Sequence, residues 1–139
     1  MAAHNDLGRW GEMIARRFLI LHDYNIRSFD WRDGHHELDI VAEKLGFLIF
    51  VEVKTRSSDR FGQPEEAIDR DKVRYLKLAA NAYMAREKVD MPCRFDVISI
   101  VTEGDSYRLR HIKDAVHADS RYQVQEYRGM NESFPSLRN

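Results

Sequence analysis

Three charged side chains in two neighbouring segments are of types that bind divalent cations and act on phosphate. Asp39 lies in HELDIVAE (36–43), whereas Glu52 and Lys54 lie in FLIFVEVKT (47–55). The second segment is dominated by β-branched and aromatic residues and lacks Gly and Pro, which predicts a buried β-strand. Residues two apart on a strand point to the same face, so Glu52 and Lys54 share one side. Buried charges are costly unless a partner or a metal ion compensates them, so this pair requires an explanation.

The length of the loop around Gly46 decides which residues of these two strands face each other. A loop of two or of four residues places Asp39 opposite Glu52 and Glu37 opposite Lys54. Directly opposed residues share a face, with their Cβ atoms about 5 Å apart. A three-residue loop would take Asp39 out of line with Glu52, so the convergence of the carboxylates depends on the loop.

Two carboxylates held this close repel each other unless positive charge lies between them. Lys54 supplies one positive charge, and a divalent cation would supply the rest. Carboxylate oxygens suit hard cations such as Mg²⁺ or Mn²⁺. A purely structural Asp/Glu–Lys cluster at the edge of the sheet is the alternative.

Two helices are predicted to pack on these strands. Apolar residues recur at helical spacing over residues 6–22, and small residues, among them Gly8 and Gly11, form a neighbouring stripe on which another backbone can approach closely. A second helix is expected over residues 64–86, because Pro64 suits a first turn and two glutamates follow it.

Further strands are expected at residues 24–31, 93–102 and 106–112. The resulting order, α-β-β-β-α-β-β, predicts an α/β domain whose mixed sheet is flanked by helices. This domain is expected to span residues 1–118. Residues 119–139 have few apolar anchors and are expected to form a loosely ordered polar tail.

The composition is that of one globular domain, with 139 residues of which 43% are hydrophobic and 32% charged. No apolar run approaches the ~20 residues of a membrane span, and no secretory signal pattern is present. The single cysteine, Cys93, suits a reducing compartment, so a cytoplasmic location is expected. A formal net charge of -1 does not favour nucleic-acid binding by bulk electrostatics, so such binding would need a local positive surface.

The ordered set of motifs resembles the YraN-like family of small bacterial proteins, in the PD-(D/E)XK nuclease superfamily and related to archaeal Holliday junction resolvases. The resemblance covers roughly residues 8–100. It is carried by Gly8-x-x-Gly11-Glu12-x-x-Ala15, Glu37-Leu38-Asp39-Ile40-Val41-Ala42, Phe50-Val51-Glu52-Val53-Lys54-Thr55-Arg56, Phe61-Gly62, Lys72 and Arg94-Phe95-Asp96-Val97. The family usually has Gly where this chain has His36, so the turn before this strand is expected to differ. His35 is then either an added metal ligand or an exposed loop residue.

The resemblance implies a restriction-endonuclease-like fold and a metal-dependent endonuclease that hydrolyses phosphodiester bonds in DNA. By the same resemblance, Asp39, Glu52 and the backbone carbonyl of Val53 hold a catalytic Mg²⁺ (or Mn²⁺), and Lys54 orients or activates the attacking water. Such chemistry requires a nucleophile at neutral pH and a cation beside the developing negative charge, and a metal ion supplies both.

Two further carboxylates are candidates for the same site. Glu12 matches a first-helix carboxylate that related resolvases use at the metal, and a surface ion pair with Arg9 or Arg16 is the alternative. Glu37 is either another ligand or a partner that neutralises Lys54.

Candidate DNA contacts follow the central motif. Lys72 lies on the apolar stripe of the second helix, where it either snorkels to solvent or reaches a phosphate. Arg56, Arg60, Arg70 and Arg74 would supply the local positive surface, and an ordinary solvated face is the alternative. DNA is favoured over RNA because no aromatic-rich RNA-binding signature is present. Selectivity for junctions or flaps and a homodimer are expected by analogy only, and a non-catalytic DNA-binding module is the alternative function.

Overall fold

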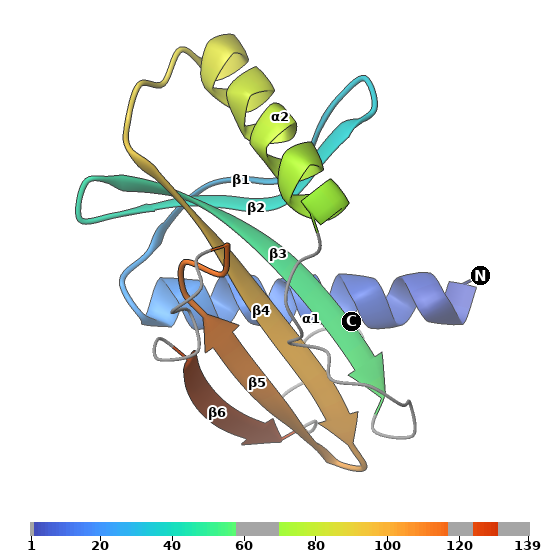
Figure 1. Cartoon of the computed structure of the whole chain (residues 1–139). Coiled ribbons are helices and arrows are strands. Elements are labelled where there is room, and N and C mark those ends of the chain that lie inside the picture. The colour runs from blue at the N-terminus through green and yellow to red at the C-terminus, as the bar shows by residue number, and fades with distance from the viewer. Residues whose placement is uncertain (1, 58–69, 117–123, 131–139) are drawn as a thin grey trace.

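The computed structural model describes residues 2–57, 70–116 and 124–130, with side chains from residue 6 onward. In chain order the elements are α1 (Ala2–Leu21), β1 (Asn25–Asp33), β2 (His36–Lys44), β3 (Phe47–Ser57), α2 (Arg70–Glu87), β4 (Cys93–Glu103), β5 (Ser106–Ile112) and β6 (Val124–Met130). The six strands form one sheet in sequence order, parallel only between β3 and β4 (Figure 1). The predicted mixed α/β sheet flanked by helices, consistent with a restriction-endonuclease-like fold, is confirmed. Neither described helix is long and apolar enough to cross a bilayer.

The sheet continues into the segment that was expected to be a loose tail. Strand β6 pairs antiparallel with β5, so the domain does not end at residue 118. Only Val124 and Tyr127 of this strand pack against the apolar clusters, and they do so on opposite faces. A strand with so few anchors has a weak sequence signal, and its pairing with β5 supplies the stabilisation. Residues 64–69, predicted as the first turns of the second helix, lie outside the described residues.

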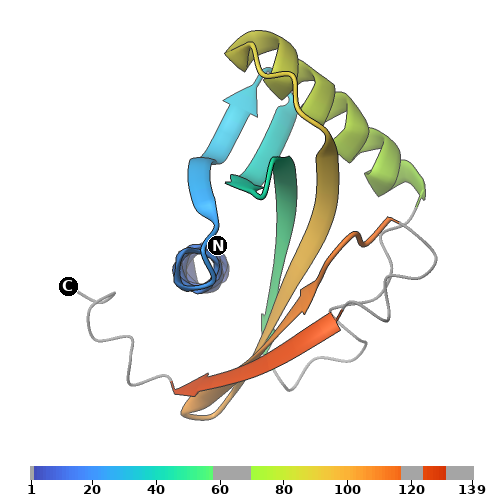
Figure 2. The same ribbon diagram turned by 90° about the vertical axis from the view of Figure 1, so that its left-hand side faces the viewer.

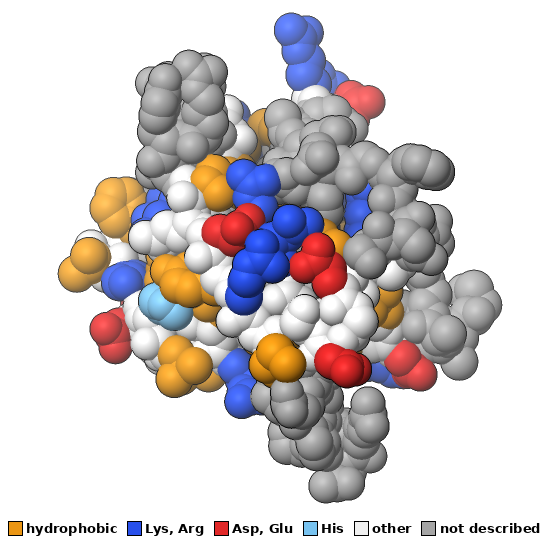
Figure 3. Space-filling view, turned by 90° about the horizontal axis from the view of Figure 1, so that it is seen from below, with side chains coloured by type: hydrophobic (Ala, Val, Ile, Leu, Met, Phe, Trp, Pro, Cys, Tyr) orange, Lys and Arg blue, Asp and Glu red, His pale blue; other side chains and the backbone are white. Residues whose placement is uncertain are grey.

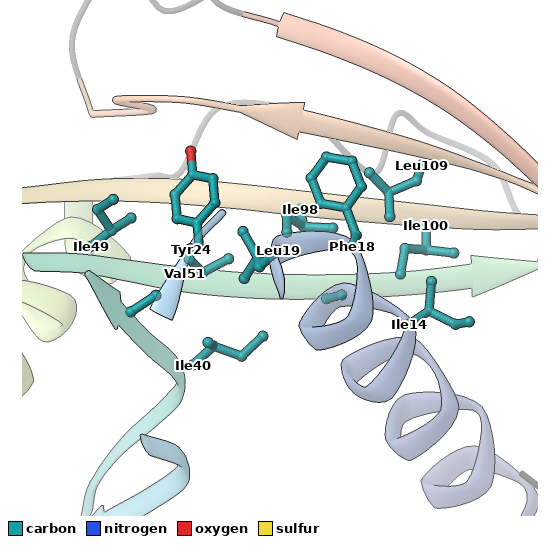
Figure 4. Packing of buried hydrophobic residues seen from close by; sticks show 12 residues of the cluster. Ile14, Phe18, Leu19, Tyr24, Ile40, Ile49, Val51, Ile98, Ile100 and Leu109 are labelled. Carbon is teal, nitrogen blue, oxygen red and sulfur yellow. The ribbon is translucent and has the colours of Figure 1, made fainter. Parts of the chain in front are cut away.

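The strands alternate their side chains between two apolar faces, and the two helices cover opposite faces (Figure 2). On the α1-side face, Ile14 and Phe18 pack on strand residues that include Ile98 and Ile100 (Figure 4). The buried cluster on the α2-side face consists of Leu38, Val41, Leu48, Phe50, Leu76, Ala79, Ala80, Tyr83, Phe95, Val97 and Ile112. Each large apolar side chain buried in this way stabilises the fold by about 1.5–3 kcal/mol, so both helices are held mainly by packing.

Helix α1 lies against β3 through one of its two predicted small residues. A Cβ atom at Gly11 would lie 1.9 Å from Oγ1 of Thr55, far inside van der Waals contact. Nothing lies within 4 Å of the corresponding position at Gly8. The close approach expected from the sequence therefore occurs at Gly11, and it sets the height of α1 above the sheet.

The hairpin between β2 and β3 has the predicted register. Leu45 and Gly46 form a two-residue turn with φ of 52° and 84°, and Val41 lies opposite Phe50. Two left-handed residues match the twist of a two-residue hairpin. This turn therefore places Asp39 and Glu52 at equivalent positions on the two strands.

A buried charged network joins the segment after α1 to strands β4 and β5. The Asp96 carboxylate, 1% exposed, accepts hydrogen bonds of 2.8 Å from both Nε and Nη2 of Arg94 and one of 2.9 Å from the backbone N–H of Asp114. It also lies 2.8 Å from Nε2 of buried His111. Hydrogen bonds with His111 and Arg94 outweigh the effect of burial and lower the pKa of Asp96. Because Arg94 also donates to the Tyr24 hydroxyl, the network joins the end of α1 to β4 and β5.

Candidate metal and phosphate site

The sheet forks at the predicted site. Pairing between β2 and β3 stops at Ile40 and Val51, after which β2 continues beside β1 while β3 continues beside β4 (Figure 1). At the fork the Asp39 carboxylate accepts a 2.8 Å hydrogen bond from the backbone N–H of Val53. Because β2 no longer pairs with β3 here, the Val53 N–H has no backbone carbonyl of β2 as a partner. The Asp39 side chain accepts its hydrogen bond instead.

A pocket of about 670 Å³ lies at this fork. It is lined by Glu12, Asp30, Trp31, Arg32, His35, Glu37, Leu38, Asp39, Glu52, Val53, Lys72 and Tyr75. Because the sheet is split here, helices on its opposite faces reach the same space: Glu12 comes from α1 and Lys72 comes from α2. The fork therefore gathers charged groups that an unbroken sheet would keep apart.

Asp39, Glu52 and Lys72 form the centre of the pocket. Asp39 and Glu52 share a side-chain hydrogen bond, and Nζ of Lys72 lies 2.9 Å from Oε2 of Glu52. Burial raises the pKa of Asp39 to about 7, and the neighbouring Glu52 charge adds to this rise, whereas the Val53 N–H opposes it. Asp39 therefore retains a proton at pH values where an ordinary aspartate is ionised.

Glu12 and Asp30 form a second acidic pair on the α1 side of the pocket. Burial raises the pKa of Glu12 to about 8, and a hydrogen bond with Asp30 and the charge of Asp39 act in the same direction. Asp30 has a φ of 50°, a left-handed conformation that Asp adopts more readily than most residues. Phe29 pairs with Ile40 and Trp31 pairs with Leu38, so Asp30 lies on β1 at the position facing Asp39 of β2.

The donor set fits a hard divalent cation. Several carboxylates share the pocket with few basic groups, and the raised pKa values of Glu12 and Asp39 reflect burial together with this excess of negative charge. Carboxylate and carbonyl oxygens are the ligands that Mg²⁺ and Mn²⁺ prefer. Among the described side chains, those of residues 6–57, 70–116 and 124–130, no three from His, Cys, Asp or Glu are already arranged as a metal-binding group. Binding would require Glu52 to turn from Lys72.

The structure brings most predicted central residues together, and Lys54 is the exception. Glu12, Asp39, Glu52, Val53 and Lys72 line the pocket. Lys54 follows Glu52 on the α2-side face of β3 but does not line the pocket.

The expected opposition of Glu37 and Lys54 is wrong, because β2 has left β3 before this point. Glu37 lines the pocket, but it lies opposite Arg32 of β1 and forms a salt bridge with it. This ion pair is more than half exposed on both sides, so its contribution to stability is small.

The predicted arginine contacts are dispersed. Arg56 lies on β3, beyond Lys54, while Arg70 and Arg74 are exposed on α2. Arg60 lies outside the described residues. None of the three described arginines lines the pocket, so any role in binding would be in the surrounding surface.

His35 lies in the turn between β1 and β2, and His36 is the first residue of β2. Gly34, with a φ of 63°, takes the left-handed position, which leaves His36 extended in β2 and paired with Asp33. His35 lines the pocket, and its backbone carbonyl accepts a 2.8 Å hydrogen bond from the Tyr75 hydroxyl.

Sequence reasoning missed Asp30 and Tyr75. A two-residue turn at Gly34 would have placed Asp30 opposite Asp39, so the signal for Asp30 was present. The Tyr75 hydroxyl, besides donating to the His35 carbonyl, accepts a 2.7 Å hydrogen bond from the backbone N–H of Glu37. A Tyr hydroxyl at the edge of an apolar stripe signals such a contact only weakly.

Comparison with known proteins places the chain among relatives of similar length. The sequence profile of the "Uncharacterised protein family UPF0102" matches residues 11–100. A UPF0102 protein of Bacteroides thetaiotaomicron is 50% identical over 117 residues, covering 84% of this chain and 97% of the relative. Relatives with the same description from Parabacteroides distasonis and Flavobacterium psychrophilum are 44% and 38% identical, covering 87% and 84% of this chain and 100% and 98% of their own lengths.

Proposed function

We propose that this chain, which belongs to the UPF0102 family, is a metal-dependent endonuclease that hydrolyses phosphodiester bonds in DNA. The proposal depends on one observation above all. Asp39 and Glu52 meet at a fork in the sheet, inside a pocket that a lysine from α2 also enters. A pocket with both carboxylates and a cation suits a phosphate ester better than it suits an apolar ligand.

The metal would be held by Asp39, Glu52 and the Val53 carbonyl, with Glu12 on the α1 side. When bound, Mg²⁺ or Mn²⁺ supplies positive charge to the phosphodiester and makes a water molecule more acidic. Because the pKa values of Asp39 and Glu12 are raised, both carboxylates would have to be in their charged forms to hold the cation.

The chain's own cations orient the substrate. Lys72, which forms an ion pair with Glu52, would donate to a phosphate oxygen from the α2 side if Glu52 held the metal instead. Lys54, on the same face of β3 as Glu52 but outside the pocket lining, would orient or activate the attacking water. Tyr75 fixes the β1–β2 turn to α2 and so keeps one wall of the pocket in place.

A non-catalytic DNA-binding module is the second candidate function. It is favoured by the position of Lys54 outside the pocket and by the lack of a ready-made metal-binding group among the described residues. Both candidates predict DNA binding, so binding alone does not separate them. Hydrolysis does.

The test is a nicking assay on end-labelled DNA with Mg²⁺ or Mn²⁺, over a panel of linear, forked, flapped and four-way substrates. The wild-type protein is expected to cut at least one branched substrate, and chelation of the metal is expected to abolish cutting. Glu52→Gln should reduce cutting at least 100-fold, because a ligand and its charge are lost. Glu43→Gln, a carboxylate on β2 outside the pocket, is the matched control and should leave cutting unchanged.

Cutting that persists unchanged in Glu52→Gln would show a contaminating nuclease. An absence of cutting on every substrate, with DNA binding intact, would support the binding module instead. An RNA duplex of the same sequence, cut faster than the DNA, would overturn the choice of DNA.

A further inference from the structure

Helix α2 covers only part of its face of the sheet, and the remaining part carries basic residues. The strands that run beyond the helix place two rows of aligned residues side by side. The pairing defines the rows as Lys54–Ser99–Arg110–Glu126 and Arg56–Val101–Arg108–Arg128, each crossing β3, β4, β5 and β6 in that order.

Alternation along each strand puts both rows on the α2-side face. Phe50, Val97, Ile112 and Val124 belong to or pack on the apolar cluster beneath α2. Every second residue of a strand points to the same face. Counting by twos from these four positions reaches each member of the two rows, so all of them lie on the α2-side face. The apolar cluster thus passes directly into a basic area on the same face of the sheet.

The charges of the two rows are strongly unbalanced. We define the basic face as Lys54, Arg56, Arg108, Arg110 and Arg128. Two carboxylates accompany it, Glu126 within the rows and Glu103 at the end of β4. The chain as a whole has a formal charge of -1, so this local excess of cations is compensated elsewhere on the molecule. The basic face therefore provides the local positive surface that DNA binding requires.

Glu103 holds two of these arginines only loosely. Its carboxylate lies 3.6 Å from Arg108 and 3.5 Å from Arg128, whose side chains are 34% and 64% exposed. Exposed ion pairs at such distances are worth little, so phosphates can replace the carboxylate at small cost. Figure 3, which views the molecule from below, shows Lys and Arg side chains gathered between acidic groups near the middle of that surface.

We propose that the basic face is a docking surface for the DNA backbone, which runs from the pocket across β4 and β5 to β6. Strands are about 4.8 Å apart, so the rows extend about 14 Å from β3. This corresponds to about four base pairs of duplex, because the phosphates of one strand are spaced 3.4 Å along the axis. The first row begins at Lys54, two residues from Glu52, so one bound segment can contact both the pocket and the basic face. The inference rests on the proposed function, since it assigns a second contact surface to the same substrate.

The test compares two double variants for their binding to labelled forked DNA in chelator, where no cutting occurs. Arg108→Gln with Arg128→Gln removes two charges from the basic face. Arg9→Gln with Lys88→Gln, at exposed positions on α1 and after α2, removes two charges elsewhere. Only the first double variant should bind at least tenfold more weakly and have a salt dependence of log Kd that is lower by about 2, because each phosphate contact contributes about 0.9.

Glu103→Gln gives a change in the opposite direction. It frees both arginines of their shared carboxylate, so DNA binding should tighten roughly threefold to tenfold, and this gain should vanish when Arg108 and Arg128 are also replaced. A gain of affinity cannot result from misfolding, so this variant keeps the test decisive.

The outcomes separate the inference from the proposed function. If the two double variants bind alike and Glu103→Gln has no effect, the basic face is not a docking surface, while Glu52-dependent cutting would still stand. If the wild-type protein does not bind DNA at all, the proposed function falls together with the inference.

Discussion

Lys72 and Glu52 form an ion pair across the pocket, with Nζ of the lysine 2.9 Å from Oε2 of the glutamate. The two residues come from different elements, α2 and β3, and the lysine takes the place next to Glu52 that a divalent cation would occupy. Two cations cannot share one carboxylate without repulsion. A metal bound as proposed would therefore compete with Lys72 for Glu52.

This competition predicts opposite effects of Lys72→Met on two ligands. Mn²⁺ should bind severalfold more tightly, because Glu52 no longer has to leave a lysine. DNA should bind severalfold more weakly in chelator, because a phosphate contact is lost. Isothermal titration of Mn²⁺ and fluorescence anisotropy with DNA measure the two effects.

Lys77→Met is the matched control, since Lys77 is exposed on the same helix and does not line the pocket. It should change neither affinity by more than about twofold. If Lys72→Met weakened both ligands equally, Lys72 would support the pocket structurally and would not compete with the metal.

The raised pKa values of Asp39 (about 7) and Glu12 (about 8) predict how stability varies with pH in metal-free buffer. Between their ordinary pKa values and the raised ones, the folded protein holds protons that the unfolded chain has released. The free energy of unfolding should therefore fall as pH rises from about 4 to 8, by on the order of a few kcal/mol, and level off above this range.

Asp39→Asn should remove about half of this pH dependence and raise Tm by several degrees at pH 8. Asn keeps an oxygen that can accept the 2.8 Å hydrogen bond from Val53, so the fold should be retained. Urea denaturation at a series of pH values in chelator measures the effect. A marked loss of stability at pH 8 in Asp39→Asn would mean that the charged carboxylate has a structural role.

Gly11 and Gly8 provide a matched pair of helix substitutions. Gly11→Ala should lower the free energy of unfolding by about 1–3 kcal/mol, because the new Cβ would meet Thr55 and push α1 away from β3. Gly8→Ala should raise it by about 0.5–1 kcal/mol, because nothing lies near that position and Ala favours the helix. Chemical denaturation measures both, and equal effects would contradict the contact with β3.

Asp96→Asn tests the buried network. The substitution leaves Arg94 without its compensating charge, so the free energy of unfolding should fall by about 3–5 kcal/mol. Because the pKa of Asp96 is lowered in the folded protein, the wild-type contribution is present above the ordinary pKa of aspartate and is lost as pH falls through the lowered value. A variant as stable as the wild type at pH 7 would show that the network is dispensable.

The two strands of the central hairpin could be predicted from their residue types, but their register could not, because the sequence left the loop length open. The structure has a two-residue turn at Leu45 and Gly46, which makes Asp39 and Glu52 equivalent positions. The close approach of α1 could be anticipated from its stripe of small residues, and it occurs at Gly11.

The fork was not predictable in the same way. Strand patterns do not show where β2 separates from β3 while it stays paired with β1, so Glu37 was placed opposite Lys54 when it lies opposite Arg32. Strand β6 was missed because its stability comes from pairing with β5 and its sequence has only two apolar anchors. In both cases the deciding interactions are between distant segments.

The most direct test of the metal site is a thermal melt at pH 8 with increasing Mn²⁺. The wild-type Tm should rise with Mn²⁺ concentration, because ligand binding to the folded state contributes about 2.7 kcal/mol at 100 times the Kd. Asp39→Asn combined with Glu52→Gln should abolish this rise, whereas Glu43→Gln should keep it. A Tm that does not respond to Mn²⁺ in the wild type, or that rises equally in the double variant, would contradict a metal site at the fork.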